Sequence, residues 1–273
     1  MKIQKLLLPI ISILMMAQLA QGQVLISFIF GDKLNSPTLK FGLDGGANFS
    51  TISNISPSKY SVGFNLGFYF DFLLKKGKPW YIHTGVLVKS PMGADNLNPY
   101  QLNNADSAYP YPYLDTIFSN GSVDRKLRYF NVPILVRYKL KMGMFFELGP
   151  MLGLLYKAND EFTTKIENKD DLSYENKVID QYRRFDVGGM AGIGYSSDLL
   201  NGMNLGIRYY YGFMDMLKDN PGKAQRNSGF YLFASIPIGA GEKAQAKNAQ
   251  RAKEKKEKQE QKLKEQELKK EKK

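Results

Sequence analysis

The sequence predicts an all-β fold, namely an eight-stranded antiparallel up-and-down transmembrane β-barrel. Eight segments of about 10–14 residues alternate apolar with polar side chains, and a period of two is typical of a strand between two different environments. That length suits a tilted strand that crosses a bilayer core. Between the two ends of the chain, no run of about 18 apolar residues offers a membrane-spanning helix instead. A membrane would therefore have to be crossed by strands.

The segment 127–140 shows the alternation most clearly. Phe130 and Ile134 lie on one apolar face, whereas Arg137 and Lys139 lie on the other. Seven more segments repeat this pattern. The eight predicted strands are 39–51, 60–73, 80–90, 127–140, 144–156, 185–195, 203–213 and 227–238.

The start of the chain predicts a signal peptide. Two lysines precede a short apolar run, which ends in Ala20-Gln21-Gly22. A basic start, an apolar stretch and small residues at the end are typical of a secretory signal cleaved near this point. The chain contains no cysteine, which excludes disulfides and cysteine-based metal sites.

The C-terminal tail has a composition of its own. From Glu242 onward it holds thirteen basic and seven acidic side chains and no aromatic residue, glycine or proline. Interleaved Glu and Lys favour a fluctuating helix or a disordered arm over a coiled coil. A secreted chain does not meet nucleic acid, so the basic charge is not assigned to nucleic-acid binding. The predicted organisation is a signal peptide at 1–22, a lead-in at 23–38, the barrel at 39–239 and a Lys/Glu-rich periplasmic tail at 240–273.

The connections between the strands alternate between short and long. The short ones are 75–79, 141–143 and 196–202, and the long ones are 91–126, 157–184 and 214–226. Short turns at one end and long loops at the other are typical of outer-membrane barrels, with the turns in the periplasm. We therefore expect the outer membrane of a Gram-negative bacterium, with outer-membrane lipid around the strands and both termini in the periplasm.

The two faces of the strands predict two surroundings. The continuous apolar rows should face lipid, with Tyr138, Tyr156, Tyr195 and Tyr211 in interfacial girdles. An eight-stranded barrel is just wide enough to be filled by side chains, so charges on the inner rows should pair with one another and close the lumen. The predicted lumen network consists of Asp44, Asp71, His83, Lys89, Arg137, Lys139, Glu147, Asp186 and Arg208.

No motif in the sequence indicates catalysis, a cofactor or a metal. His83 is the only histidine, and its carboxylate neighbours are better explained by charge balance in the lumen. The glycines of 188–194 lack the spacing of a dinucleotide fingerprint. The connection 91–126 carries Tyr100, Tyr109, Tyr111 and Tyr113 among prolines. Such a segment suits either a binding surface or a lid over the barrel mouth.

The run YFNVPILVRY at 129–138 resembles a characteristic strand of the PorT-like outer-membrane β-barrel family. Further similarities are Gly149-Pro150 with Gly153, Asp186 to Tyr195, and Arg208 to Phe213 followed by Asp215. The long charged tail departs from the family pattern, and the strand around His83 lacks a Glu that is often found there. The resemblance implies barrel strands without an active site and an accessory role in type IX protein secretion.

These observations predict a non-enzymatic outer-membrane barrel that acts as a structural or interaction component of the envelope. Its loops or its tail would bind an envelope or secretion-system protein. Two alternatives remain open, a small-solute or ion pore and an outer-membrane lipid hydrolase.

Overall fold

The computed structural model describes residues 36, 38–100, 117–165, 170–197 and 202–238. The predicted signal peptide, nearly all of the lead-in and the charged tail lie outside these residues, as do Tyr109, Tyr111 and Tyr113. The domain boundaries at those ends therefore stay predictions. No helix in the described part is long and apolar enough to cross a membrane.

Two compact units make up the chain. One is Gly42–Ile236, and the other combines Met1–Phe41 with Pro237–Lys273. In the second unit, the amide of Ile238 donates a hydrogen bond of 3.0 Å to the carbonyl of Phe41. The first unit holds the barrel.

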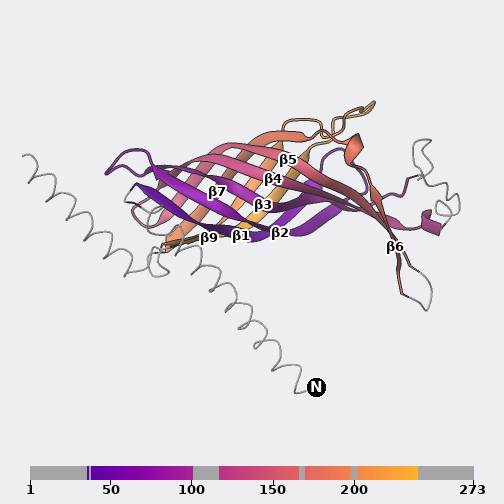
Figure 1. Cartoon of the computed structure of the whole chain (residues 1–273), viewed down its shortest axis with the longest axis horizontal. Coiled ribbons are helices and arrows are strands. Elements are labelled where there is room, and N and C mark those ends of the chain that lie inside the picture. The colour runs from indigo at the N-terminus through magenta and orange to yellow at the C-terminus, as the bar shows by residue number, and fades with distance from the viewer. Residues whose placement is uncertain (1–35, 37, 101–116, 166–169, 198–201, 239–273) are drawn as a thin grey trace, which may run out of the picture. The chain divides into compact units, whose positions relative to one another are not determined.

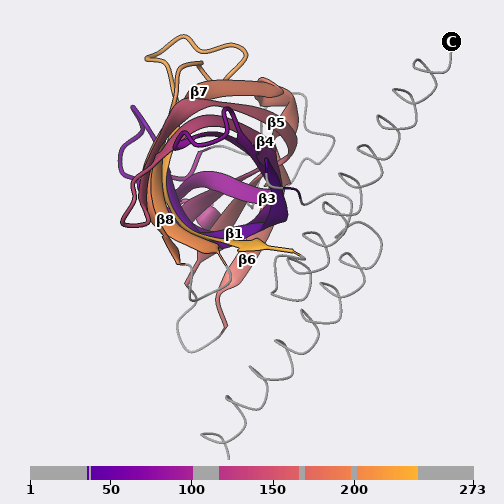
Figure 2. The same ribbon diagram turned by 90° about the vertical axis from the view of Figure 1, so that its left-hand side faces the viewer.

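The predicted barrel of eight strands is confirmed. The sheet runs in the order β4-β3-β2-β1-β9-β8-β7-β5-β6, and β4 also pairs with β5. This pairing closes eight strands into a ring, which Figure 2 shows end-on, and leaves β6 outside it. The strands are β1 (Leu39–Ile52), β2 (Lys59–Leu73), β3 (Trp80–Leu97), β4 (Ser122–Lys139), β5 (Met144–Thr164), β6 (Leu172–Lys177), β7 (Phe185–Ser197), β8 (Met203–Gly212) and β9 (Asn227–Pro237).

Three strands continue past their predicted ends. Parts of the two connections predicted as loops, 91–126 and 157–184, are therefore strands, and the prediction is wrong there. β3 reaches Leu97, β4 begins at Ser122 and β5 reaches Thr164. The additional strand β6 pairs with Asn159–Thr164 of β5, and a short 3₁₀ helix follows it at Ile179–Gln181. Residues 91–97 of β3, 122–128 of β4 and 157–164 of β5 form, together with β6, a sheet that continues the barrel wall beyond its long-loop end (Figure 1). We call this sheet the extension.

The polarity of the two strand faces reverses between the barrel and the extension, while the alternation of inward and outward side chains along β4 continues. Along β4, Phe130 and Ile134 face outward, but earlier in the same strand the outward residues are Lys126 and Arg128. Outward side chains contact lipid in one region and water in the other. The sequence pattern for a lipid-facing strand fails in the extension because the outward row is charged there and the inward row is mostly apolar.

The extension has a small aromatic core of its own. Phe162 is fully buried, and its ring centroid lies 5.0 Å from that of Tyr100, 5.9 Å from Phe118 and 6.4 Å from Tyr174. On the opposite side, the ion pair between Lys126 and Glu161 links β4 to β5. The ion pair between Lys157 and Glu175 links β5 to β6. The aromatic contacts supply most of the stabilisation, because exposed ion pairs contribute little.

Aromatic rings gather at two levels on the outer surface of the barrel. Near the short turns, the centroids of Trp80 and Tyr138 are 4.7 Å apart. Toward the extension, Phe130 stacks on Tyr156 at 4.5 Å. The exposed residues between these levels are apolar. Such paired levels are the aromatic girdles of an outer-membrane barrel.

Replacement of the central aromatic residue tests the extension. Phe162→Ala should lower the free energy of local unfolding of the β5–β6 pair by about 3–5 kcal/mol, because a large buried ring is lost. Hydrogen exchange of the β5 and β6 amides measures this. Leu172→Ala, at a side chain 39% exposed in β6, is the matched control and should change it by less than about 1 kcal/mol. Equal effects would show that the aromatic core does not hold the extension.

Candidate functional site

The most polar part of the described barrel is an ion-pair network in its lumen, near the short turns. Each of its six side chains comes from a different strand and points inward, and each is at most 5% exposed. They are Asp44 of β1, Asp71 of β2, His83 of β3, Arg137 of β4, Glu147 of β5 and Arg208 of β8. The structure thus brings together six of the nine residues predicted for the lumen.

Glu147 joins two guanidinium groups at the centre of the network. Arg137 donates to Glu147 Oε2 from Nε and Nη2 at 2.9 and 2.8 Å, and from Nη1 to Asp71 Oδ2 at 3.0 Å. Arg208 donates from Nε to Glu147 Oε1 at 2.5 Å and from Nη1 to Asp44 Oδ2 at 2.9 Å. Every guanidinium thus bridges two carboxylates, the arrangement that best offsets the cost of burying charge.

His83 of β3 completes the network. Its Nδ1 lies 2.6 Å from Asp71 Oδ1, and its Nε2 lies 2.9 Å from Arg208 Nη2. Asp44 Oδ2 lies 3.6 Å from the same Nε2, so the ring lies between two carboxylates and a guanidinium. The ring also stacks on Tyr69, with centroids 5.5 Å apart.

Strand register explains why these residues meet. Asp71 lies directly opposite His83, and Arg137 lies directly opposite Glu147. Gly192 lies opposite Arg208 on β7, and a Cβ atom there would come within 3.0 Å of both Arg208 Cγ and Glu147 Oε1. A glycine at this position therefore makes room for the guanidinium.

Aromatic rings cover the network on the side of the lumen that leads to the short turns, because Phe145 precedes Glu147 on β5 and Phe233 lies opposite Gly206, below Arg208 on β8. The guanidinium carbon of Arg137 lies 4.3 Å from the ring centroid of Phe145, and that of Arg208 lies 3.7 Å from the centroid of Phe233. Cation–π contacts of this kind are strongest away from water. The two rings shield the ion pairs from the short-turn mouth of the lumen.

Asp186 belongs to a separate polar cluster higher in the lumen. Asn227 Nδ2 donates to Asp186 Oδ2 at 2.8 Å and to the hydroxyl of Tyr129 at 3.1 Å. Buried apolar side chains surround this level, among them Leu127, Met151, Leu155 and Met190. No ion pair is found for Asp186 within the described residues.

Two predicted lumen lysines lie outside the network. Lys89 is exposed, with its ammonium 5.8 Å from the ring centroid of Phe64, so its predicted inward position is wrong. A β-bulge adds one residue to β3 between Leu87 and Ser90, and this insertion turns Lys89 to the outer face. Lys139 is half-buried at the short-turn rim, where its ammonium donates to Ser196 Oγ at 2.9 Å.

A second ion pair, which sequence reasoning missed, closes the lumen at the extension. Arg125 donates two hydrogen bonds to Asp160 at 2.9 and 2.8 Å, and both side chains are buried. Tyr100 donates to the same carboxylate at 3.0 Å and accepts a hydrogen bond from Asn176. Burial and the neighbouring Asp160 carboxylate raise the pKa of Tyr100 above its ordinary value. The signal available in the sequence was the alternation of 122–128, which continues with apolar residues on the inner face.

This arrangement has the chemistry of a structural plug. His83 is fully buried, and both of its ring nitrogens are engaged by Asp71 and Arg208. A general base must reach a substrate proton, so this histidine does not fit a hydrolase site at the barrel rim. Tyr100 is one of the four tyrosines predicted for a loop binding surface. It packs against Phe162 inside the extension, so its ring is not available to a binding partner.

Comparison with protein families agrees with this geometry. A family model described as an outer membrane protein beta-barrel domain matches residues 19–218, which is most of the chain. The chain belongs to this outer-membrane β-barrel family. It is therefore a protein of the outer membrane, and no protein with curated information matches its sequence.

Solved outer-membrane barrels are similar to the chain at low sequence identity. The attachment invasion locus protein Ail of Yersinia pestis is 12% identical with a TM-score of 0.35, over 74% of this chain and 99% of Ail. Neisserial surface protein A is 12% identical with a TM-score of 0.34, over 72% and 96% of the two chains. OprG of Pseudomonas aeruginosa is 12% identical with a TM-score of 0.31, over 72% and 93%.

Removal of one guanidinium tests the network. Arg208→Met keeps the bulk of the side chain but leaves Glu147 and Asp44 without a shared cation. It should lower the free energy of unfolding by about 3–5 kcal/mol. Urea unfolding in phospholipid vesicles, followed by fluorescence of Trp80, the only tryptophan, measures this. Lys89→Gln on the outer face is the control and should stay within about 0.5 kcal/mol of the unsubstituted protein. A loss below about 1 kcal/mol for Arg208→Met would contradict the structural role of the network.

Proposed function

We propose that this protein is a non-enzymatic, non-conducting component of the outer membrane that binds another envelope protein through its parts outside the bilayer. The observation that carries the proposal is the filled lumen. A barrel whose interior is occupied by its own side chains offers function only at its ends and on its outer surface.

Successive layers of side chains block the lumen along its length. The ion-pair network lies near the short turns, with Phe145 on its short-turn side and Leu135 on its extension side, each at no more than 1% exposure. Apolar residues follow, and the pair of Arg125 and Asp160 closes the extension end. Each ion pair is buried and hydrogen-bonded, so removal of any layer is costly. This arrangement supports a static plug more than a solute path.

The extension supports the choice of an interaction role. Its aromatic core and cross-strand ion pairs hold the ends of β3 and β4, from which the connection 98–121 departs. That connection is rich in tyrosine and proline, a composition that gives large contact areas at low entropic cost. In this proposal the short turns and both termini are periplasmic, and the extension is extracellular.

The finer assignment is to an accessory role in type IX protein secretion. It rests on the resemblance of the YFNVPILVRY strand at 129–138 to the PorT-like family. Within that role, the basic tail of residues 242–273 would contact an acidic partner subunit in the periplasm.

The plug predicts electrical silence. Purified full-length protein in planar lipid bilayers should show no stepwise conductance under an applied voltage, because no continuous aqueous path crosses the lumen. Simultaneous substitution of Arg137 and Arg208 by alanine is the comparison, and any conductance it produces shows that the assay can detect an open lumen. Regular conductance steps from the unsubstituted protein would support the pore alternative and overturn this part of the proposal.

Partner capture from native membranes tests the interaction role. Tagged full-length protein should retain a defined envelope protein after crosslinking. Its capture should be abolished by one of two deletions, residues 101–116 if the loop binds the partner or residues 242–273 if the tail does. Quantitative mass spectrometry of the eluates measures this, with Lys89→Gln as a variant that keeps the partner. An identical set of proteins from all variants would exclude both the loop and the tail as binding segments. Capture of type IX secretion components in particular would bear on the finer assignment.

A further inference from the structure

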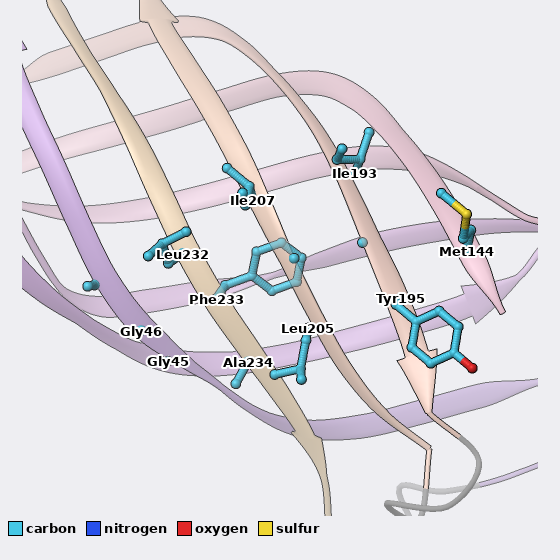
Figure 3. A pocket seen from close by; sticks show the side chains of 13 residues that line it. Gly45, Gly46, Met144, Ile193, Tyr195, Leu205, Ile207, Leu232, Phe233 and Ala234 are labelled. Atoms are coloured by element: carbon cyan, nitrogen blue, oxygen red, sulfur yellow. The ribbon is translucent and has the colours of Figure 1, made fainter.

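A shallow apolar groove crosses the outer surface of the barrel near the short turns. It has a volume of about 600 Å³ and runs over β5, β7, β8, β9 and β1 (Figure 3). Figure 3 shows Met144 and Tyr195 at one side of the groove, Leu232 at the other, and Leu205 between them. All of these strand segments belong to the barrel unit.

The groove exists because small residues interrupt the outward rows. Gly45 and Ala47 of β1 and Ala234 of β9 lie where neighbouring strands carry large apolar side chains. Two inward glycines, Gly194 and Gly206, deepen it, because only backbone separates the groove from the rings behind. A Cβ atom at Gly206 would come within 2.8 Å of the Phe233 ring.

The depth of the groove in the membrane follows from strand register. Met144 pairs with Tyr195, Tyr195 with Leu205, and Leu205 with Ala234. This level begins at the first residue of β5, directly after the turn 141–143. The groove therefore lies within the leaflet on the short-turn side of the barrel.

The lining offers water nothing to bind, since it is formed almost entirely by apolar side chains and backbone already paired in the sheet. An empty groove would also lose dispersion contacts along its walls. A bilayer supplies flexible apolar chains at this depth. A second copy related by a two-fold axis would set one concave surface against another and leave both unfilled.

Positive charge stands at the polar end of the groove. The turn that carries the exposed Lys141 lies against Tyr195, because a Cβ atom on Gly143 would come within 3.0 Å of the Tyr195 ring. A lysine at the end of an apolar groove complements a phosphate attached to an acyl chain.

We propose that this groove is a binding site for one anionic phospholipid of the surrounding leaflet. An acyl chain lies over Gly45, Ala47 and Ala234, and the phosphate lies beside Lys141 at the short-turn rim. The site is independent of any protein partner and of which side of the membrane the short turns face.

Native mass spectrometry of the full-length protein tests the site. Protein released from micelles that contain phosphatidylglycerol should retain one lipid. Ala234→Phe and, independently, Ala47→Leu should reduce its occupancy at least about tenfold, because each fills the groove. Lys141→Gln should reduce the preference for phosphatidylglycerol over phosphatidylcholine about fivefold. Ala191→Phe is the matched control, since Ala191 is exposed on β7 outside the groove, and it should retain the lipid.

Heat-dependent mobility on gels confirms that each variant is folded. Two independent groove variants are used so that the test remains valid if one of them does not fold. Equal lipid occupancy in the unsubstituted protein, Ala234→Phe and Ala47→Leu would overturn the proposal. It would also be overturned if the unsubstituted protein were a dimer that either groove variant dissolves, because the groove would then be a contact between copies. Unchanged preference in Lys141→Gln would refute the assigned position of the phosphate.

Discussion

Burial of charge inside a closed eight-stranded wall is the constraint on which the rest of the structure depends. The lumen is too narrow to hydrate isolated ions, yet three carboxylates and two guanidinium groups are placed there within a few ångströms of one another. Each becomes tolerable only when its partners on other strands are present. The network therefore stabilises the correctly closed barrel, because its members come from six different strands.

The outer surface obeys a different constraint, which changes along a single strand. Within the bilayer the outward residues of β4 are Phe130, Ile134 and Val136, and in the extension they are Lys126 and Arg128. The inner face compensates by becoming apolar where the outer face becomes charged. One strand can therefore cross lipid and then continue into water without a break in its hydrogen bonding. This continuity turns part of two long connections into a rigid sheet.

These two constraints limit the surfaces that can bind other molecules. The ion pairs and rings that fill the lumen stabilise the barrel. The surfaces left for recognition are the extension, the connections that depart from it and the outer face toward lipid. The groove near the short turns belongs to the last of these, and a lipid held there would stabilise the wall at the level of the ion-pair network. Binding of a protein partner and binding of a lipid are compatible, because the partner is bound outside the bilayer and the lipid on the outer face within it.

The sequence by itself determined the architecture, since lipid on one side of a wall and a narrow lumen on the other impose a period of two that can be read residue by residue. The inward positions of Asp71, His83 and Arg208 follow from that period alone. Tertiary structure decided the rest. Parity counting cannot detect the bulge that turns Lys89 outward, because the extra residue is defined only against a partner strand. The pairing of Arg125 with Asp160 depends on the register between β4 and β5, and the six-residue network depends on closure of the ring. Both are contacts between strands, and a pattern along one strand contains no information about its neighbours.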